Sequence, residues 1–64
     1  MERAIIGTSE AVEAEYAAQC DAPFCLALAD DNEVYSVEGF KSLEAAVKSA
    51  RDGGFLANQI EVLG

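Results

Sequence analysis

The stretch Phe24–Ala29, with the sequence FCLALA, is apolar at every position. Successive side chains of a strand point to opposite faces of a sheet, so this run would carry apolar groups on both faces. Such a strand is covered on both faces, or covers a partner that binds it. The acidic residues 29–33 then turn the chain, and Val34–Glu38 is expected as the return strand. Residues 24–38 therefore predict a hairpin with a loop of about four residues.

The remaining elements are expected on either side of this hairpin. They are a strand over residues 3–7, a helix over 9–20 that begins at Thr8 or Ser9, a helix after Ser42, and a strand over 59–63. The order β-α-β-β-α-β predicts one α+β domain over residues 1–64. Its commonest packing is ferredoxin-like, with a four-stranded antiparallel sheet and two helices on one face. Strand order 4-1-3-2 is preferred, and a different order or a sheet shared between two chains is the alternative.

The charge of the chain is unevenly placed. Its formal net charge is −8, and residues 1–38 hold nine acids against Arg3 alone, whereas residues 39–64 are balanced. Nucleic acid and anionic membranes would be repelled, and a basic protein surface would be attracted. We therefore expect a basic nucleic-acid-binding protein or complex as the partner, with no direct nucleic-acid or membrane contact, and a monomer or homodimer as the oligomeric state.

The densest group of acids lies in the hairpin turn, at Asp30, Asp31 and Glu33. In the ferredoxin-like topology the first helix would begin at the same end of the sheet as this turn, which would join two remote acidic segments into one patch. Tyr35, on the return strand, is expected to pack in the core with its hydroxyl at the surface, or to be an aromatic anchor if the acidic end is an interface. The candidate partner-binding residues are Glu10, Glu13, Glu15, Asp30, Asp31, Glu33, Tyr35 and Glu38.

Three interpretations of these acids are open. They could be solvated surface groups, since Asp and Asn are good turn formers. They could imitate a nucleic-acid backbone, because eight charges correspond to roughly 14 Å of duplex, which fits within the roughly 28 Å width expected of the domain. They could bind a divalent cation, but the spacing lacks the alternate acids, central Gly and distal Glu of an EF-hand. No metal site is therefore expected.

Catalytic chemistry has little support in the residues. Histidine is absent, and there is no Walker loop, G-x-G-x-x-G or G-x-S-x-G motif, so neither enzyme activity nor a cofactor is expected. No signal peptide or membrane-spanning run is visible, which favours the cytoplasm. A disulfide between Cys20 and Cys25 is geometrically conceivable, but in a cytoplasmic chain two small buried hydrophobic residues are the preferred interpretation.

Short length, strong acidity, the lack of a catalytic motif and the β-α-β-β-α-β order resemble the small phage-encoded inhibitors of bacterial defence, especially anti-CRISPR proteins. Some of those proteins are DNA mimics that occupy the groove meant for target DNA. The resemblance implies a non-catalytic inhibitor of a basic nucleic-acid-binding groove, such as that of a CRISPR effector complex, acting in the host cytoplasm. No shared motif carries it, so no residue role is transferred.

A second hypothesis is a structural or assembly module that dimerises or joins a larger complex through an apolar sheet face or edge. A sheet with both helices on one face would leave one apolar face of residues 24–29 open. An apolar face of that kind favours a partner. Such association would be nearly insensitive to salt, whereas mimicry of phosphates would be salt-labile.

Overall fold

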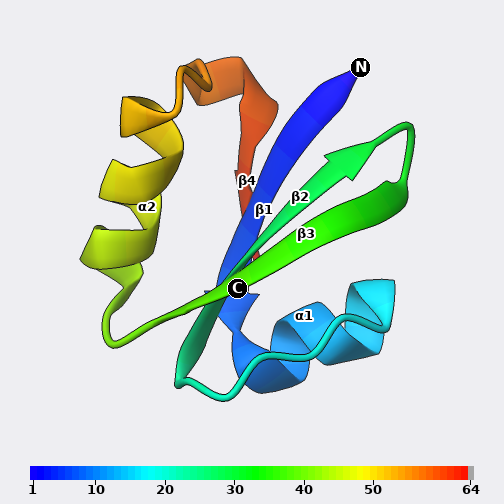
Figure 1. Ribbon diagram of the computed structural model, residues 1–64, viewed down its shortest axis with the longest axis vertical. Coiled ribbons are helices and arrows are strands. Elements are labelled where there is room, and N and C mark those ends of the chain that lie inside the picture. Colours follow the sequence, from blue (N-terminus) through cyan, green and yellow to red (C-terminus); the bar gives the residue numbers. More distant parts are fainter. Residues whose placement is uncertain (64) are drawn as a thin grey trace.

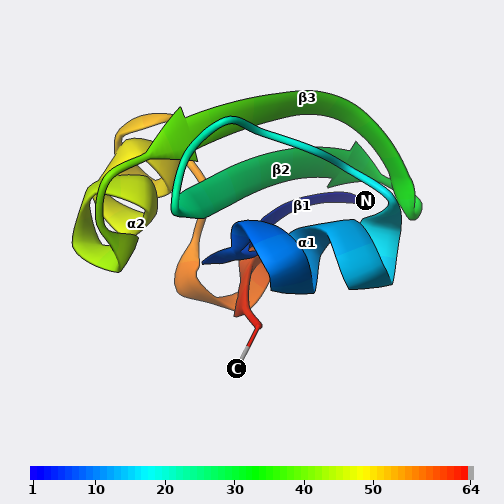
Figure 2. The same cartoon turned by 90° about the horizontal axis from the view of Figure 1, so that it is seen from below.

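The computed structural model describes residues 1–63, and these form a sheet with two helices (Figures 1 and 2). The elements in chain order are β1 (Glu2–Thr8), α1 (Ser9–Tyr16), β2 (Phe24–Asp30), β3 (Glu33–Phe40), α2 (Leu43–Asp52), a 3-10 turn η1 (Ala57–Gln59) and β4 (Ile60–Val62). The predicted order of helices and strands is confirmed. Neither helix within residues 1–63 has the length and apolar character needed to cross a membrane.

The sheet has the strand order β3-β2-β1-β4. β2 pairs antiparallel with both β1 and β3, whereas β4 pairs parallel to β1. The sheet is therefore mixed. The predicted antiparallel ferredoxin-like sheet with order 4-1-3-2 is wrong, although the broader prediction of a small α+β domain with four strands and two helices is confirmed.

The two helices lie on opposite sides of the sheet, not on one face as predicted (Figure 1). Val12 of α1 packs in one buried cluster with Ile5 of β1 and Ala27 of β2. The intervening side chains of the two strands point to the other face, where α2 lies. The buried cluster there consists of Ala4, Ile6, Leu26, Ala46 and Ala50. The core is thus two thin layers separated by the sheet.

The apolar character of the two central strands explains this arrangement. In β1 the adjacent residues Ile5 and Ile6 are both fully buried. In β2 Cys25 and Ala27 are fully buried on one face, and Leu26 is almost fully buried on the other. In the predicted order β2 would be an edge strand with one face open to water. Placing β1 and β2 in the centre with a helix over each face removes both apolar surfaces from water. Within residues 1–63 both sheet faces are covered by a helix, so the open apolar face that the assembly hypothesis assumed is not found there.

Both helices begin at the predicted capping residues. Thr8 Oγ1 accepts a 3.2 Å hydrogen bond from the Ala11 amide, and Ser42 Oγ accepts one of 3.1 Å from Ala45. α1 is shorter than the predicted 9–20, because Ala17 adopts a left-handed conformation with φ 55° and ends it. The following loop returns the chain to the start of the helix, where the Ser9 amide donates to Pro23 O at 3.1 Å.

Cys20, in that loop, is joined by a disulfide to Cys25 in β2. The Cα atoms are 6.1 Å apart, within the range that a disulfide spans. Cys25 is fully buried and belongs to the α1-side cluster. The preferred interpretation of Cys20 and Cys25 as two unlinked small buried residues is therefore wrong, and the disulfide that the sequence also allowed is the arrangement observed.

The hairpin between β2 and β3 is tighter than predicted. Asp30 pairs with Glu33, which leaves a loop of two residues, Asp31 and Asn32. Both loop residues have positive φ, 50° and 72°, which is the signature of a type I′ turn. Asp and Asn tolerate this left-handed conformation better than most residues with a Cβ atom. Part of the polar character of the turn is therefore required by the backbone.

Candidate functional site

Three carboxylates form a row across three neighbouring strands. Glu2 of β1 is the register partner of Asp30 of β2, and Asp30 is the register partner of Glu33 of β3. Directly paired residues project to the same face of a sheet, so the row lies on the α2 face beyond Leu28. Like charges directly opposite one another are destabilising. The row therefore needs cations or hydrogen-bond donors nearby.

The amino group of Met1 supplies one positive charge to this row. It lies 3.2 Å from Asp30 Oδ1 and 2.7 Å from Asp31 Oδ1. The hydrogen bonds to Asp31 and then Asp30 raise the pKa of this amino group above 8.0. The same contact lowers the pKa of Asp31 below 3.8, because the ammonium group stabilises the carboxylate. All three groups are largely exposed, so salt will weaken these interactions.

Tyr35 of β3 contacts the row through Glu2. The register between β2 and β3 shifts between Leu28 and Ala29, which pair with Ser36 and Val34, so Tyr35 is the extra residue of a β-bulge. Its hydroxyl donates a 3.0 Å hydrogen bond to Glu2 Oε1. Partial removal from water raises the pKa of Tyr35, and the hydrogen bond to Glu2 and the charges of Glu2 and Asp30 raise it further.

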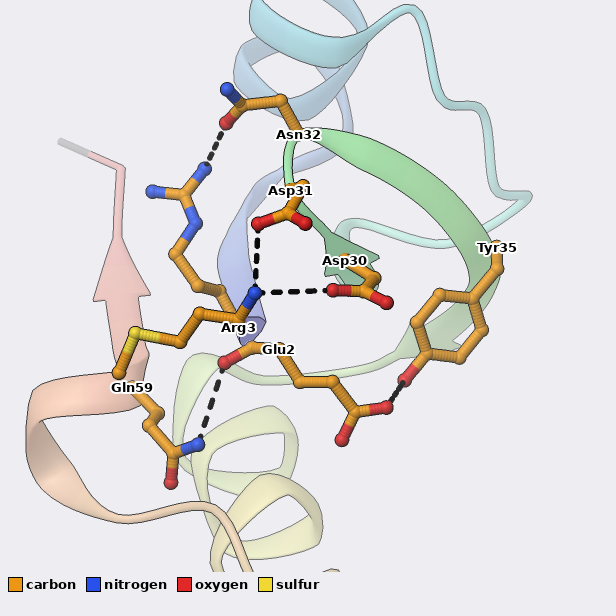
Figure 3. A network of polar contacts seen from close by, with 8 residues as sticks. Glu2, Arg3, Asp30, Asp31, Asn32, Tyr35 and Gln59 are labelled. Atoms are coloured by element: carbon orange, nitrogen blue, oxygen red, sulfur yellow. Dashed lines mark hydrogen bonds and ion pairs between the residues drawn. The ribbon is translucent and has the colours of Figure 1, made fainter.

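Arg3 links the turn to α1 on the other face of the sheet. Its guanidinium donates to Asn32 Oδ1 at 2.8 Å, to Tyr16 Oη at 3.3 Å and to Glu61 Oε1 at 2.9 Å. Asn32 and Arg3 point toward each other in Figure 3. The C-terminal end of α1 therefore lies beside the turn. This cation is engaged by Glu61 and does not neutralise the row of Glu2, Asp30 and Glu33.

The structure brings together only some of the predicted binding residues. Four of them line one shallow depression at the turn: Asp30, Asp31, Glu33 and Tyr35. The predicted convergence of the start of α1 with the turn is wrong, because Thr8 pairs with Phe24 at the end of the sheet opposite the Glu2–Asp30 pair. Glu10 therefore lies at the far end, while Glu15 precedes Tyr16 at the near end.

The other two predicted residues lie away from the turn. Glu13 projects from the middle of α1 and accepts a 3.0 Å hydrogen bond from Gln19 Nε2. Glu38 is an exposed residue of β3 and pairs in register with Leu26, near the opposite end of the hairpin. The acids thus form a dense group at the turn and a sparser series along α1 and β3.

Cations do not balance these groups in the described part of the chain. Within residues 1–63 the ion pairs join Met1 to Asp30 and Asp31, and Arg3 to Glu61. Lys48 and Arg51 lie on α2, with Lys41 just before it. The molecule therefore has an electrically mixed α2 layer, while the turn and α1 are negative. Within residues 1–63, nine of the twelve Asp and Glu side chains take part in no ion pair: Glu2, Glu10, Glu13, Glu15, Asp21, Glu33, Glu38, Glu44 and Asp52.

Sequence reasoning missed Glu2, the Met1 amino group and Asn32 as parts of this site. Glu2 lies at the first position of β1. Residues 2, 4 and 6 of a strand project to the same face, so Glu2 lies on the face of Ala4 and Ile6. Its partnership with Asp30 depends on β1 and β2 being neighbours, which the pattern did not predict. Asn32 is in the quoted turn, but its hydrogen bond to Arg3 again requires the β1–β2 pairing.

The chemistry available here is recognition of cations and hydrogen-bond donors. Within residues 1–63, no three His, Cys, Asp or Glu side chains are placed to share a metal ion. Comparisons of the chain with protein-family models, curated protein sequences and solved structures find no match. Function is therefore inferred from the geometry and charge of the molecule itself.

Proposed function

We propose that this protein is a non-catalytic binding protein whose carboxylates occupy a basic surface of another protein, in place of nucleic-acid phosphates. The chain resembles anti-CRISPR proteins in size and charge. The basic surface that we propose is therefore of the kind that binds target DNA in a CRISPR effector complex. The acidic turn, with Glu2, Asp30, Asp31 and Glu33, supplies the densest contacts. Glu15 and Glu13 of α1 add negative charge on the other face of the sheet.

The observation that supports this proposal is the uncompensated charge of the turn. The turn has four carboxylates, on Glu2, Asp30, Asp31 and Glu33, and the Met1 ammonium group pairs with two of them, Asp30 and Asp31. Together these groups carry three net negative charges. Holding like charges in register costs stability in a domain of this size. A partner that brings Lys or Arg side chains would relieve that repulsion, so association would be electrostatically favoured and fast.

The dimensions of the molecule are compatible with this role. Its longest extent is 24 Å. Duplex DNA carries one charge per about 1.7 Å of its axis, so the eight net charges of the chain correspond to roughly 14 Å of duplex. The charge density is therefore of the order needed to compete for a groove that binds phosphates.

Capture from bacterial lysate on the immobilised protein, at low and at high salt, tests the proposal. We expect a protein that is retained at low salt, released at high salt and displaced by duplex DNA. The captured protein should bind duplex DNA by itself and lose that DNA when the acidic protein is added in excess.

Two matched double variants provide the control. Asp31→Asn with Glu33→Gln removes two carboxylates from the turn and keeps a residue that accepts positive φ at position 31. Glu44→Gln with Asp52→Asn removes two exposed carboxylates from α2. The turn variant should lose most of the DNA-displaceable binding and the α2 variant should retain it. Equal binding by both variants, or a captured protein without affinity for nucleic acid, would refute the proposal.

A further inference from the structure

β3 is an exposed edge of the sheet. It is eight residues long and lies outermost in the order β3-β2-β1-β4, so within residues 1–63 no strand pairs with its outer side. The opposite edge, β4, has only three residues. A strand edge presents N–H and C=O groups that can pair with another chain. The long free edge is therefore on β3.

The two faces of β3 differ in chemistry. Glu33 and Glu38 lie on the α2 face, because their register partners Asp30 and Leu26 do. Val34 and Val37 lie on the α1 face, where they are partly buried against the core. A strand added outside β3 would have side chains beside the two glutamates on one face and beside the two valines on the other.

The edge has few of the devices that block pairing. Residues 33–40 contain no Lys, Arg or Pro, the residues most often used to protect an edge strand. The bulge at Tyr35 bends the strand locally, and Glu33 and Glu38 carry the charges. A second copy of this chain would bring the same negative edge and a net charge of −8, so the charges disfavour a β3–β3 dimer. The charges of β3 instead favour pairing with a strand that carries Lys or Arg.

We propose that the outer edge of β3 binds an extended segment of a partner protein by strand addition. The segment alternates Lys or Arg with aliphatic residues, so that the cations lie beside Glu33 and Glu38 and the aliphatic side chains extend the layer of Val34 and Val37. This rests on the proposed function only in requiring a basic partner. It adds a backbone recognition mode that mimicry of phosphates does not need.

Binding of synthetic peptides to the purified protein tests this inference directly. The probe is a capped eight-residue peptide of alternating lysine and valine, and its control is the block isomer with four lysines followed by four valines. At about 0.15 M salt, where the Debye length is about 8 Å, the alternating peptide should bind at least about tenfold more tightly, a difference of 1.4 kcal/mol. Backbone amides of β3 should exchange more slowly with solvent when it is bound.

Two N-methylated forms of the alternating peptide separate strand addition from simple charge attraction. One carries N-methyl groups on the valines and the other on the lysines. Since only alternate N–H groups of a strand point to one neighbour, one form should lose binding and the other should keep it. Equal binding of both forms, or of the alternating and block peptides, would overturn the inference.

Charge-reversal variants locate the peptide. Glu33→Lys with Glu38→Lys should weaken binding of the alternating peptide by more than about tenfold, whereas Glu44→Lys with Asp52→Lys on α2, with the same change of net charge, should not. Equal loss in both variants would overturn the inference.

The two proposals can fail separately. Binding of the peptide by strand addition, with no DNA-displaceable partner in lysate, would contradict the proposed function alone. A DNA-displaceable partner in lysate, with no strand addition by the peptide, would contradict this inference alone. Dimerisation of the protein through β3 without peptide would also overturn the inference, because a second copy would then occupy that edge.

Discussion

The side chains of Tyr35 and Glu2 meet across an intervening strand, with the Tyr35 hydroxyl donating a 3.0 Å hydrogen bond to Glu2 Oε1. Tyr35 is on β3 and Glu2 is on β1, and β2 lies between them. The bulge supplies Tyr35 as an extra residue near the turn, and its side chain points toward Glu2. The pair joins the strands at the acidic end of the sheet.

Alkaline titration should report this contact. In a Tyr16→Phe variant, Tyr35 is the single tyrosine, and its ultraviolet absorbance should show a pKa above the ordinary value, raised by partial loss of water and by Glu2. Because folding raises this pKa, the contribution of Tyr35 to stability is present below its unfolded pKa and is lost as pH rises through the folded value. Glu2→Gln should shift the titration to lower pH. An unchanged titration would show that the two side chains do not interact in solution.

Acetylation of the Met1 amino group should lower the thermal midpoint of the 64-residue chain. The amino-group pKa is raised, so its contribution is present below about pH 8 and is lost as pH rises through the folded value. The Asp31 pKa is lowered, so its contribution is present above about pH 4 and is lost as pH falls through the folded value. Thermal melts at several pH values provide the measurement. In an Asp31→Asn background acetylation should matter less, and an equal effect in both backgrounds would contradict the ion pair.

Substitution at Asn32 should separate the backbone requirement of the turn from its hydrogen bond. Asn32→Ala and Asn32→Gly both remove the amide that accepts from Arg3, but only glycine adopts the observed φ of 72° without a Cβ penalty. The alanine variant should be less stable than the glycine variant by about 1–2 kcal/mol, measured by urea unfolding. Equal stability would mean that the left-handed turn is not kept in solution.

Reduction of the Cys20–Cys25 disulfide should destabilise the protein. The bond closes a short loop with a sequence separation of 5, for which chain entropy predicts roughly 2 kcal/mol. Unfolding with and without a dithiol reductant measures the difference. A Cys20→Ala, Cys25→Ala variant should match the reduced protein and should not respond to reductant. Rapid reaction of a thiol reagent with the untreated native protein would contradict the disulfide.

Packing of α2 on the sheet can be tested by enlarging one residue. Ala46 is fully buried against Ala4, Ile6 and Leu26, whereas its neighbour Ala45 is exposed. Ala46→Leu should destabilise the protein by about 1–3 kcal/mol through overpacking, whereas Ala45→Leu should stay within about 0.5 kcal/mol. Urea unfolding of the two variants gives the comparison. Similar stabilities would mean that α2 does not cover this face.

Local patterns predicted the elements well. The helix after Ser42, the caps at Thr8 and Ser42 and the hairpin after Phe24 depend on neighbours within a few residues. The predicted length of α1 was wrong because the left-handed Ala17 interrupts an alanine-rich segment that would otherwise favour a helix. The candidate site was predicted only where the turn itself supplies the residues. Glu2 and the Met1 amino group reach it through strand pairing.

The sequence by itself determined that residues 24–29 carry apolar groups on both faces of a strand, that the Asp- and Asn-rich segment after them turns the chain, and that the excess of negative charge lies before residue 39. The tertiary structure decided which strands are neighbours, and hence which acids meet. With β2 beside β1 and a helix on each face, both apolar surfaces are buried, the turn lies beside Glu2 and Met1, and the start of α1 lies at the other end. Sequence spacing cannot decide this, because the choice of strand order depends on burial summed over the whole sheet.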